Sequence, residues 1–311
     1  MSDRYRGVRR AEEHRSPLRS VVIIGVFLVL AVAGLRFVPG SPLAARAAEQ
    51  GGPTSGAPAP SAAPTPSPTP PPLPPLPVRP AEVTLDAEGW WGWAIMDTRT
   101  GEISGSDNMT ETSTTASMIK AWISADYLRR SAEDGKTPSD YRLSQITRII
   151  RDSHNEYAQQ LFNEVGRTAS IKRLIKICEL TDSKPAKDGG WSSTRLSPRD
   201  TARMGACIAD GRAAGPKWTD WLLNEMRHVR GVGDFGIRKA FPAAEQKTIA
   251  IKNGWIDRPE DQEFNVSCMA IGDGWTMGVL VRYPFSVGGS YAEYGMKECQ
   301  KIAAQLLAPA P

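Results

Sequence analysis

Residues 82–311 carry two hydrophobic periods, one typical of strands and one typical of helices. Apolar and aromatic residues predict a strand over 88–98, and Thr100-Gly101 turns the chain into a second strand over 102–106. Helical spacing then predicts helices from near Ser117 to a stop at Gly135, and over 143–152, 156–165, 169–179, 198–210 and 218–228. Apolar runs over 247–255, 264–271 and 275–283 predict three further strands, and 292–307 predicts a closing helix.

This order of elements predicts an α+β fold: an antiparallel β-sheet with flanking helices plus an all-helical part. The N-terminal hairpin should join the three C-terminal strands in that sheet. Residues 82–311 are enough for one sizeable core, so we expect a single domain and, in solution, a monomer. A polar loop without hydrophobic period, 181–196, separates two of the helices.

Residues 1–38 are typical of a targeting segment rather than of part of a packed core. Residues 1–20 are rich in arginine and are expected to stay in the cytoplasm. Residues 21–38 are apolar, although the uncharged run 21–35 is shorter than the about 20 residues of a spanning helix, and Arg36 can snorkel at its end. We expect a signal anchor that tethers an extracytoplasmic domain to the membrane. The alternative is a signal peptide cleaved near Ala47, with the domain secreted.

Residues 39–81 predict a disordered linker, because thirteen of the 25 prolines fall between 53 and 80. Such a stretch cannot bury a core, and residues 51–80 should be largely polyproline II, which reaches on the order of 90 Å at about 3.1 Å per residue. It suits a spacer between the membrane and the domain. A ligand for proline-binding modules is the alternative interpretation.

The charge follows the same division and argues against nucleic acid as a partner. The net charge of the chain is +4. Nine arginines and four acidic residues give residues 1–80 a charge of +5, which leaves −1 for residues 81–311. The expected domain therefore has no basic excess to neutralise phosphates. With three histidines and no CxxC or HExxH pattern, neither a zinc site nor any other cofactor is expected.

Four cysteines fall in the expected domain, at Cys178, Cys207, Cys268 and Cys299. Four cysteines allow three pairings. The first two lie on the helices that flank the polar loop, and the others lie on a strand and on the closing helix. We favour disulfides 178–207 and 268–299, because export makes oxidation the better interpretation; four free buried thiols are the alternative.

Ser117-Met118-Ile119-Lys120 reads SxxK where a helix should start. Residues three apart lie on one helix face, so the hydroxyl and the amine can meet. A serine hydroxyl needs a base within hydrogen-bond reach to act as a nucleophile, and a lysine whose pKa is lowered can be that base. Alone the pattern is weak, since a capping serine and a solvated lysine would read the same.

Two further patterns follow in order. Ser153-His154-Asn155 reads SxN between two helices, where the hydroxyl can relay a proton and the amide can hold a carbonyl. Lys252-Asn253-Gly254 reads KxG inside a strand, followed by Trp255. A glycine in a strand often marks the close approach of another backbone or a ligand, and the lysine offers charge for a carboxylate.

Together the three motifs resemble the penicillin-recognising serine hydrolases, and most of all an actinobacterial, exported, class A β-lactamase-like type. The resemblance extends to the opening hairpin, the closing strands and the last helix. It implies the following roles: Ser117 is the acylated nucleophile, Lys120 its general base, Ser153 the proton shuttle, and Asn155, Lys252, Asn253, Gly254 and Trp255 bind substrate. Backbone N–H groups of Ser117 and Trp255 would form the oxyanion hole.

The sequence departs from that family in places. His154 replaces the usual aspartate, Asn253 replaces a hydroxyl residue, and Trp255 is bulkier than usual. The loop that holds a deacylating glutamate in class A enzymes here has only Asp182 and Asp188 as acids. The resemblance therefore implies a serine hydrolase acylated by β-lactam or peptidoglycan-type amides, with deacylation impaired.

A different class of function stays open: an inactive cell-envelope binding module that kept this fold. Residues 231–236 match GxGxxG, but they follow a helix and precede no clear one, the reverse of a dinucleotide-binding context. We interpret them as a loop that enters the Lys252 strand. Trp191 and Trp255 are the tryptophans expected near a substrate.

Overall fold

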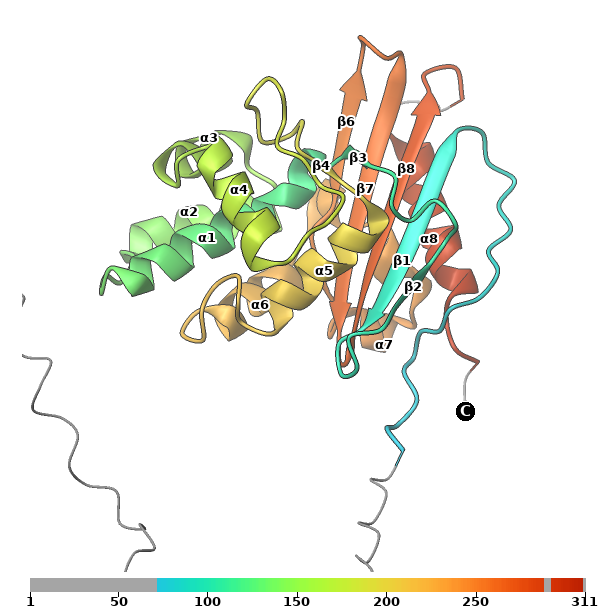
Figure 1. The fold of residues 1–311 in the computed structure, drawn as a ribbon, viewed down its shortest axis with the longest axis horizontal. Helices are drawn as coiled ribbons and strands as arrows, with labels where there is room; N and C mark the ends of the chain where they lie inside the picture. The colour runs from blue at the N-terminus through green and yellow to red at the C-terminus, as the bar shows by residue number, and fades with distance from the viewer. Residues whose placement is uncertain (1–71, 288–291, 310–311) are drawn as a thin grey trace, which may run out of the picture. The chain divides into compact units, whose positions relative to one another are not determined.

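The computed structural model describes residues 72–287 and 292–309 (Figure 1). The expected Arg-rich segment 1–20, the apolar segment 21–38 and most of the Pro-rich linker lie outside the described residues. Within 72–287 and 292–309, no helix combines the length and the apolar character that a membrane span requires.

One antiparallel sheet forms the centre of the domain. Its strands run in the order β2-β1-β8-β7-β5, and β6 pairs with another part of β7. Their bounds are β1 Trp90–Asp97, β2 Ile103–Gly105, β5 Ala250–Ile251, β6 Gly254–Arg258, β7 Glu263–Gly272 and β8 Trp275–Pro284. The expected pairing of the N-terminal hairpin with the C-terminal strands is confirmed, because β1 pairs with β8 along the whole of β1, with Trp93 opposite Val279.

Helices cover both faces of this sheet. On β8, Gly278 meets α5 (Pro198–Ala209), while Tyr283 meets α8 (Glu293–Gln305) through Gly295. Strand side chains alternate between faces, and these two positions differ in parity, so α5 and α8 lie on opposite sides. The α+β prediction is confirmed.

The remaining helices form the all-helical part to one side of the sheet (Figure 1). They are α1 Lys120–Glu133, α2 Asp140–Arg151, α3 Asn155–Glu164, α4 Thr168–Ile177 and α6 Thr219–Arg227. The short α7, Ala243–Gln246, lies apart from them, against the 3₁₀ turn Ile237–Ala240. The expected cap of α5 is present: the Ser197 hydroxyl accepts from the Asp200 N–H, with Pro198 at the first helical position.

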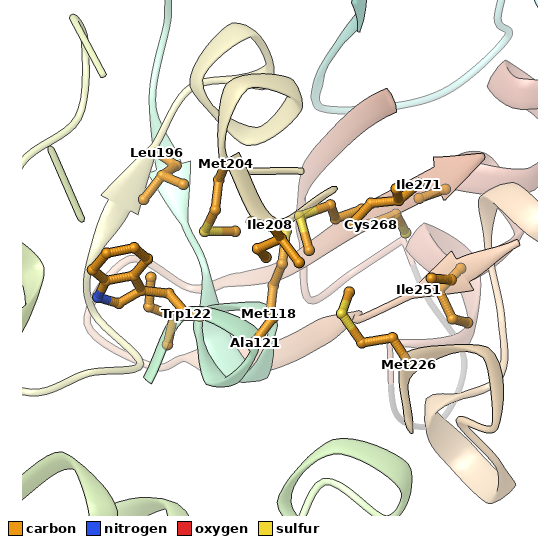
Figure 2. Close-up of a cluster of buried hydrophobic side chains, with 14 of the residues drawn as sticks. Met118, Ala121, Trp122, Leu196, Met204, Ile208, Met226, Ile251, Cys268 and Ile271 are labelled. Atoms are coloured by element: carbon orange, nitrogen blue, oxygen red, sulfur yellow. The ribbon is translucent and has the colours of Figure 1, made fainter. Parts of the chain in front are cut away.

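The core lies where the start of α1 meets α5 and the sheet (Figure 2). Met118 and Trp122 are fully buried beside Met204 and Ile208 of α5, with Cys268 and Ile271 of β7 close by. The indole N–H of Trp122 is satisfied by the Ser170 carbonyl at 3.1 Å. Burial of large apolar side chains at the start of α1 fixes that end of the helix against the sheet.

Both disulfides have the pairing that the sequence favours. Cys178 bonds to Cys207, which ties the end of α4 to α5, and Cys268 bonds to Cys299, which ties β7 to α8. Such bonds are typical of proteins that mature in an oxidising, extracytoplasmic compartment.

Three boundaries differ from expectation. The strand expected over 247–255 is interrupted at Lys252 and Asn253, so β5 and β6 are separate. Ser117 lies in a 3₁₀ turn, Ala116–Ile119, and the α-helix begins only at Lys120. The linker expected to end at residue 81 already packs on the domain at Val78, which is 3% exposed and pairs with Leu307.

Candidate functional site

The SxxK residues lie at the junction between the turn Ala116–Ile119 and α1. Ser117 is half-buried, and Lys120 is fully buried as the first residue of the helix. Ala116, just before the serine, has a φ of +44°, which is rare for a residue with a side chain. Its N–H donates to the Ser192 carbonyl at 3.0 Å, so the polar loop helps hold this strained conformation. Strain of this kind clusters at functional sites.

The SxN residues lie between α2 and α3. Ser153 also has a positive φ, +58°, and Asn155 is the first residue of α3. His154 caps that helix, because its Nδ1 accepts from the Tyr157 N–H at 3.3 Å, and its ring stacks on Tyr157. The departure at His154 therefore serves the helix end, and the two outer residues of the motif are left to face Lys120.

The Ser153 hydroxyl lies between the two buried lysines. Its oxygen is 3.3 Å from Lys120 Nζ and 3.1 Å from Lys252 Nζ. Lys120 also donates to the Ser153 carbonyl and to Asn155 Oδ1, each at 2.6 Å. The fold thus joins all three motifs in one cluster, although they are far apart in the sequence.

Burial changes the acid–base character of both lysines. It lowers the pKa of Lys120 to about 6, with a further lowering by the charge of Lys252. It lowers the pKa of Lys252 to about 7. At neutral pH Lys120 is therefore mostly a free amine, with two N–H donors and one lone pair. The two short bonds to the Ser153 carbonyl and Asn155 use the donors, which leaves the lone pair to accept a proton.

Gly254 brings β6 against the nucleophile turn. A Cβ at this position would lie 2.6 Å from the backbone nitrogen of Ser117, and it would also clash with the Thr115 carbonyl. Only glycine permits this approach, as the KxG pattern suggested. Trp255, the next residue, lines the cavity beside Ser117.

Asn253 takes a different place from the one expected. Its amide donates to the carbonyls of Gly233 at 3.1 Å and Phe235 at 2.8 Å, and the side chain is buried. It therefore ties the break between β5 and β6 to the loop 231–236. That loop begins with a short 3₁₀ turn, Gly231–Gly233. A second turn, Ile237–Ala240, and α7 follow before β5, so the loop does not enter the Lys252 strand directly as expected.

The cleft has two arms that share Ser117, Asn155 and Trp255. A cavity of about 720 Å³ extends from them along α3, the polar loop and β6. A smaller one of about 350 Å³ extends toward Ser153 and Arg230. Arg230 is paired there with Asp152 at 2.6 Å. Ser117 thus stands where an extended substrate could pass on both sides.

Trp191 places an aromatic ring between the larger cavity and Lys120. The ring centroid is 4.8 Å from Lys120 Nζ, and the indole N–H donates to Gln159 Oε1 at 3.0 Å. Trp191 and Trp255, the tryptophans expected near a substrate, both line the cavity that Ser117 lines. Gln159 was missed, although its spacing of four from Asn155 on a helix places both on one face.

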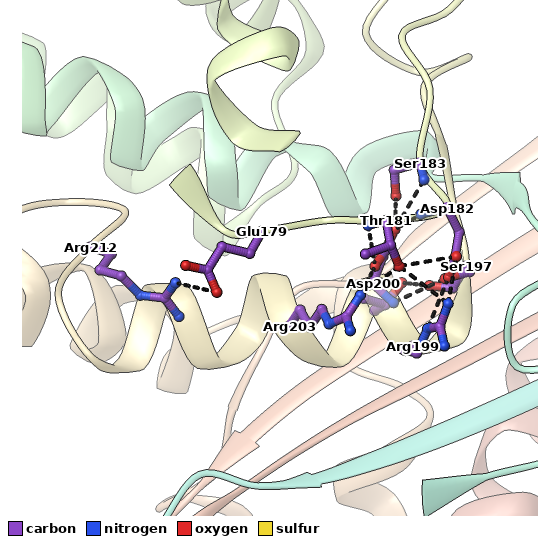
Figure 3. Close-up of polar contacts among 10 residues, drawn as sticks. Glu179, Thr181, Asp182, Ser183, Ser197, Arg199, Asp200, Arg203 and Arg212 are labelled. Carbon is purple, nitrogen blue, oxygen red and sulfur yellow. Dashed lines mark hydrogen bonds and ion pairs between the residues drawn. The ribbon is translucent and has the colours of Figure 1, made fainter. Parts of the chain in front are cut away.

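The acids near the polar loop hold the loop itself (Figure 3). Asp182 accepts from the Ser197 hydroxyl and the Arg199 guanidinium, each at 2.7 Å. Asp200 accepts from the N–H groups of residues 181, 182 and 183. Glu179 is an exposed residue that pairs with Arg212.

Asp188, the remaining acid of the loop, is also committed. Its carboxylate accepts from the Gly190 N–H and the Ser193 hydroxyl at 2.8 Å each. These bonds lower the pKa of Asp188, which weakens it as a base. It is not among the residues that line the cavity. Among the described residues, no group of three or more histidine, cysteine, aspartate or glutamate side chains could hold a metal ion.

Comparison with known proteins places the fold. No family model matches the sequence, and no curated protein matches it. Among solved structures, a reconstructed ancestral class A β-lactamase has 17% identity and a TM-score of 0.53 over 70% of this chain and 93% of that chain. The class A β-lactamase from Mycobacterium abscessus has 15% identity, a TM-score of 0.53 and the same coverage. A β-lactamase from Chitinophaga pinensis has 18% identity and a TM-score of 0.52. The domain therefore has a class A β-lactamase-like fold.

Proposed function

We propose that this protein is an exported serine hydrolase that is acylated at Ser117 by β-lactams or peptidoglycan-type amides. The observation that carries the proposal is the Ser153 hydroxyl held between Lys120 and Lys252, at 3.3 and 3.1 Å, beside a cavity that Ser117 lines. Two buried lysines that share a hydroxyl are costly for stability, and perturbed groups of this kind cluster at reactive sites.

The acylation step follows from the lone pair of Lys120. Ser117 Oγ attacks the amide carbonyl carbon while Lys120 takes the hydroxyl proton, which gives a tetrahedral oxyanion and an ammonium. The Ser153 hydroxyl passes a proton from the ammonium to the leaving nitrogen, and the C–N bond breaks to leave an ester on Ser117. The backbone N–H groups of Ser117 and Trp255 receive the oxyanion, and losing one such donor costs about 10²–10³ in rate.

The free structure is one rearrangement away from that geometry. Among the described residues, the Ser117 hydroxyl has no hydrogen bond, and Lys120 contacts Ser153 and Asn155 instead. Catalytic hydrogen bonds are often long or absent without substrate and form in the complex. A substrate N–H that donates to Asn155 Oδ1 in place of the Lys120 amine would free Lys120 to turn toward Ser117.

We further propose that the acyl-enzyme is hydrolysed slowly. A water that attacks the ester needs a base, and the loop acids Asp182 and Asp188 already have partners. Trp191 covers Lys120 on the cavity side with an apolar ring. The proposal also includes export of the domain, which either stays tethered to the membrane or is secreted after cleavage near Ala47. The two disulfides agree with export.

The second candidate is a binding module without turnover. Two observations favour it: within the described residues Lys120 Nζ is bonded to Ser153 and Asn155 and not to the Ser117 hydroxyl, and the Asn253 amide is bonded to the loop 231–236. In that case the cleft holds a cell-envelope ligand without forming a covalent bond.

Intact mass separates the two candidates. The domain is incubated with a penicillin, with Ser117→Ala as the control, and a mass increase equal to the penicillin is expected only in the wild type. No adduct in the wild type would favour the binding module. A chromogenic cephalosporin tests deacylation: we expect about one equivalent of product per protein, and rapid multiple turnover contradicts slow hydrolysis.

A further inference from the structure

The larger cavity has an unusual charge pattern. Glu156 and Asp257 are the charged residues among those that line it, and no lysine or arginine is among its described lining residues. The other side chains include the rings of Trp191, Trp255, Phe264 and Phe285. The cavity thus combines aromatic surface with two carboxylates, which is the chemistry that attracts an organic cation.

Both carboxylates are available to a ligand. Neither Glu156 nor Asp257 has a side-chain hydrogen bond or an ion pair within residues 72–287 and 292–309, and both are exposed. The neighbouring acids differ, since Asp152 is paired with Arg230 and Asp188 accepts two hydrogen bonds. Of these four neighbouring acids, the two that line the larger cavity are therefore the unpaired ones.

The two residues come from separate elements. Glu156 lies in the first turn of α3, where the helix dipole favours a negative charge, so it has a structural explanation of its own. Asp257 lies on β6, where no helix dipole stabilises its negative charge, so the explanation that applies to Glu156 does not apply to Asp257. Their convergence on one cavity that also holds Ser117 points to a ligand.

We propose that this arm of the cleft selects a substrate whose acyl side carries an ammonium group on an apolar body, with Glu156 and Asp257 as the specificity-determining residues. The inference rests on the proposed function, because it assigns a substrate class to the same site. The rings bind the apolar body and the face of the cation, while the two carboxylates attract the ammonium and repel a substrate carboxylate at the same position.

Three penicillins test this selection, because they share one nucleus and differ in side-chain charge: ampicillin (ammonium), benzylpenicillin (neutral) and carbenicillin (carboxylate). Acylation rates are measured by intact mass at low salt. We expect the order ammonium, neutral, carboxylate, with about tenfold between the extremes, since each exposed charge pair contributes only a few-fold. In the Glu156→Gln/Asp257→Asn double variant the ratio should fall to about one. Equal rates in the wild type, or an unchanged ratio in the double variant, overturn the inference.

A control and a binding measurement make the test independent of acylation. Glu102→Gln/Asp220→Asn removes two exposed carboxylates outside the cavity and should leave the ratio unchanged. Titration calorimetry on Ser117→Ala gives the non-covalent Kd of the same three compounds, and the same order is expected. Failure of the ammonium compound to bind, or a carboxylate that binds as tightly, overturns the selection, whereas an absent adduct in the wild type overturns only the acylation.

Discussion

At the scale of single residues, the site depends on where the protons of two lysines reside. Lys120 and Lys252 are both fully buried and share the Ser153 hydroxyl. Their titrations are coupled, so a rate profile reports the pair rather than either residue. The SxxK, SxN and KxG patterns name these residues from sequence, but burial sets their chemistry, and burial depends on tertiary packing.

We predict a bell-shaped pH profile for acylation, with its maximum between about 6 and 7. Lys120 must be neutral to accept a proton, so the rate rises as pH increases through about 6. Lys252 must be charged to attract a substrate carboxylate, so the rate falls as pH increases through about 7. Adduct formation measured by intact mass across pH 5–9 checks this, and a rate that climbs steadily to high pH would contradict it.

Trp191→Ala should move the acidic limb of that profile to higher pH. The ring excludes water from Lys120, and burial is the larger cause of its lowered pKa. Loss of the ring also removes a cation–π contact that favours the ammonium, which works in the opposite direction but is the smaller effect. Trp191→Phe keeps a ring and should keep the limb in place. A limb at lower pH in the alanine variant would show that the cation–π contact dominates.

At the scale of elements, the close approach of β6 to the turn Ala116–Ile119 positions the site. The sequence predicts a close approach at Gly254 but not the break in the strand before it, because the apolar run over 247–255 is typical of one continuous strand. The break has a tertiary cause: Asn253 is bonded to the carbonyls of Gly233 and Phe235. Similarly, the pairing of β3 (Ser113–Thr114) with β4 (Arg195–Leu196) escapes prediction, because two-residue strands have no period.

Gly254→Ala should therefore be damaging to both stability and acylation. Its Cβ would lie 2.6 Å from the backbone nitrogens of Ser117 and Met118, which cannot move without shifting the start of α1. We expect a loss of about 1–3 kcal/mol and a slower acylation. Urea unfolding measures the first. Gly233→Ala adds a Cβ in ordinary contact, 3.4 Å from Val229, and should cost far less; equal losses would contradict the steric account.

Asp200→Asn tests how the polar loop is held. The carboxylate is fully buried and accepts from three successive N–H groups at the start of the loop and from Arg203 (Figure 3). An amide nitrogen cannot accept, so we expect a loss of about 2–4 kcal/mol and faster hydrogen exchange over 181–196. Asp210→Asn, at a surface pair with Arg212, is the matched control. Unchanged exchange in the loop would rule out this role.

At the scale of the whole molecule, two disulfides join elements that packing in the core also holds together. The sequence favours their pairing because each cysteine falls on an identifiable element, and the structure has that pairing. The charge division adds that residues 81–311 are close to neutral. Because the domain has almost no net charge, individual charged residues in the cleft, such as Lys120 and Lys252, determine its electrostatics.

Replacing Cys178 and Cys207 together with alanine should lower the free energy of unfolding by about 2–4 kcal/mol, because the bond closes a loop across 29 residues. For a domain of this size that corresponds to roughly 5–15 °C in Tm. Differential scanning calorimetry without reductant measures the shift. A Tm equal to that of the wild type would mean that the helices are held by packing alone.

The antiparallel pairing of Val78 with Leu307 brings the two ends of the described domain together. The Arg79 N–H donates to the Leu306 carbonyl and the Ala308 N–H to the Pro77 carbonyl, each at 2.8 Å. A short peptide joining these ends would thus add little strain, and new termini could be opened at the turn of Gly101, where a side chain would meet open space. Such a circular permutant keeps every contact of the cleft, but its N- and C-termini leave the domain at Gly101 instead of at the Val78–Leu307 pair.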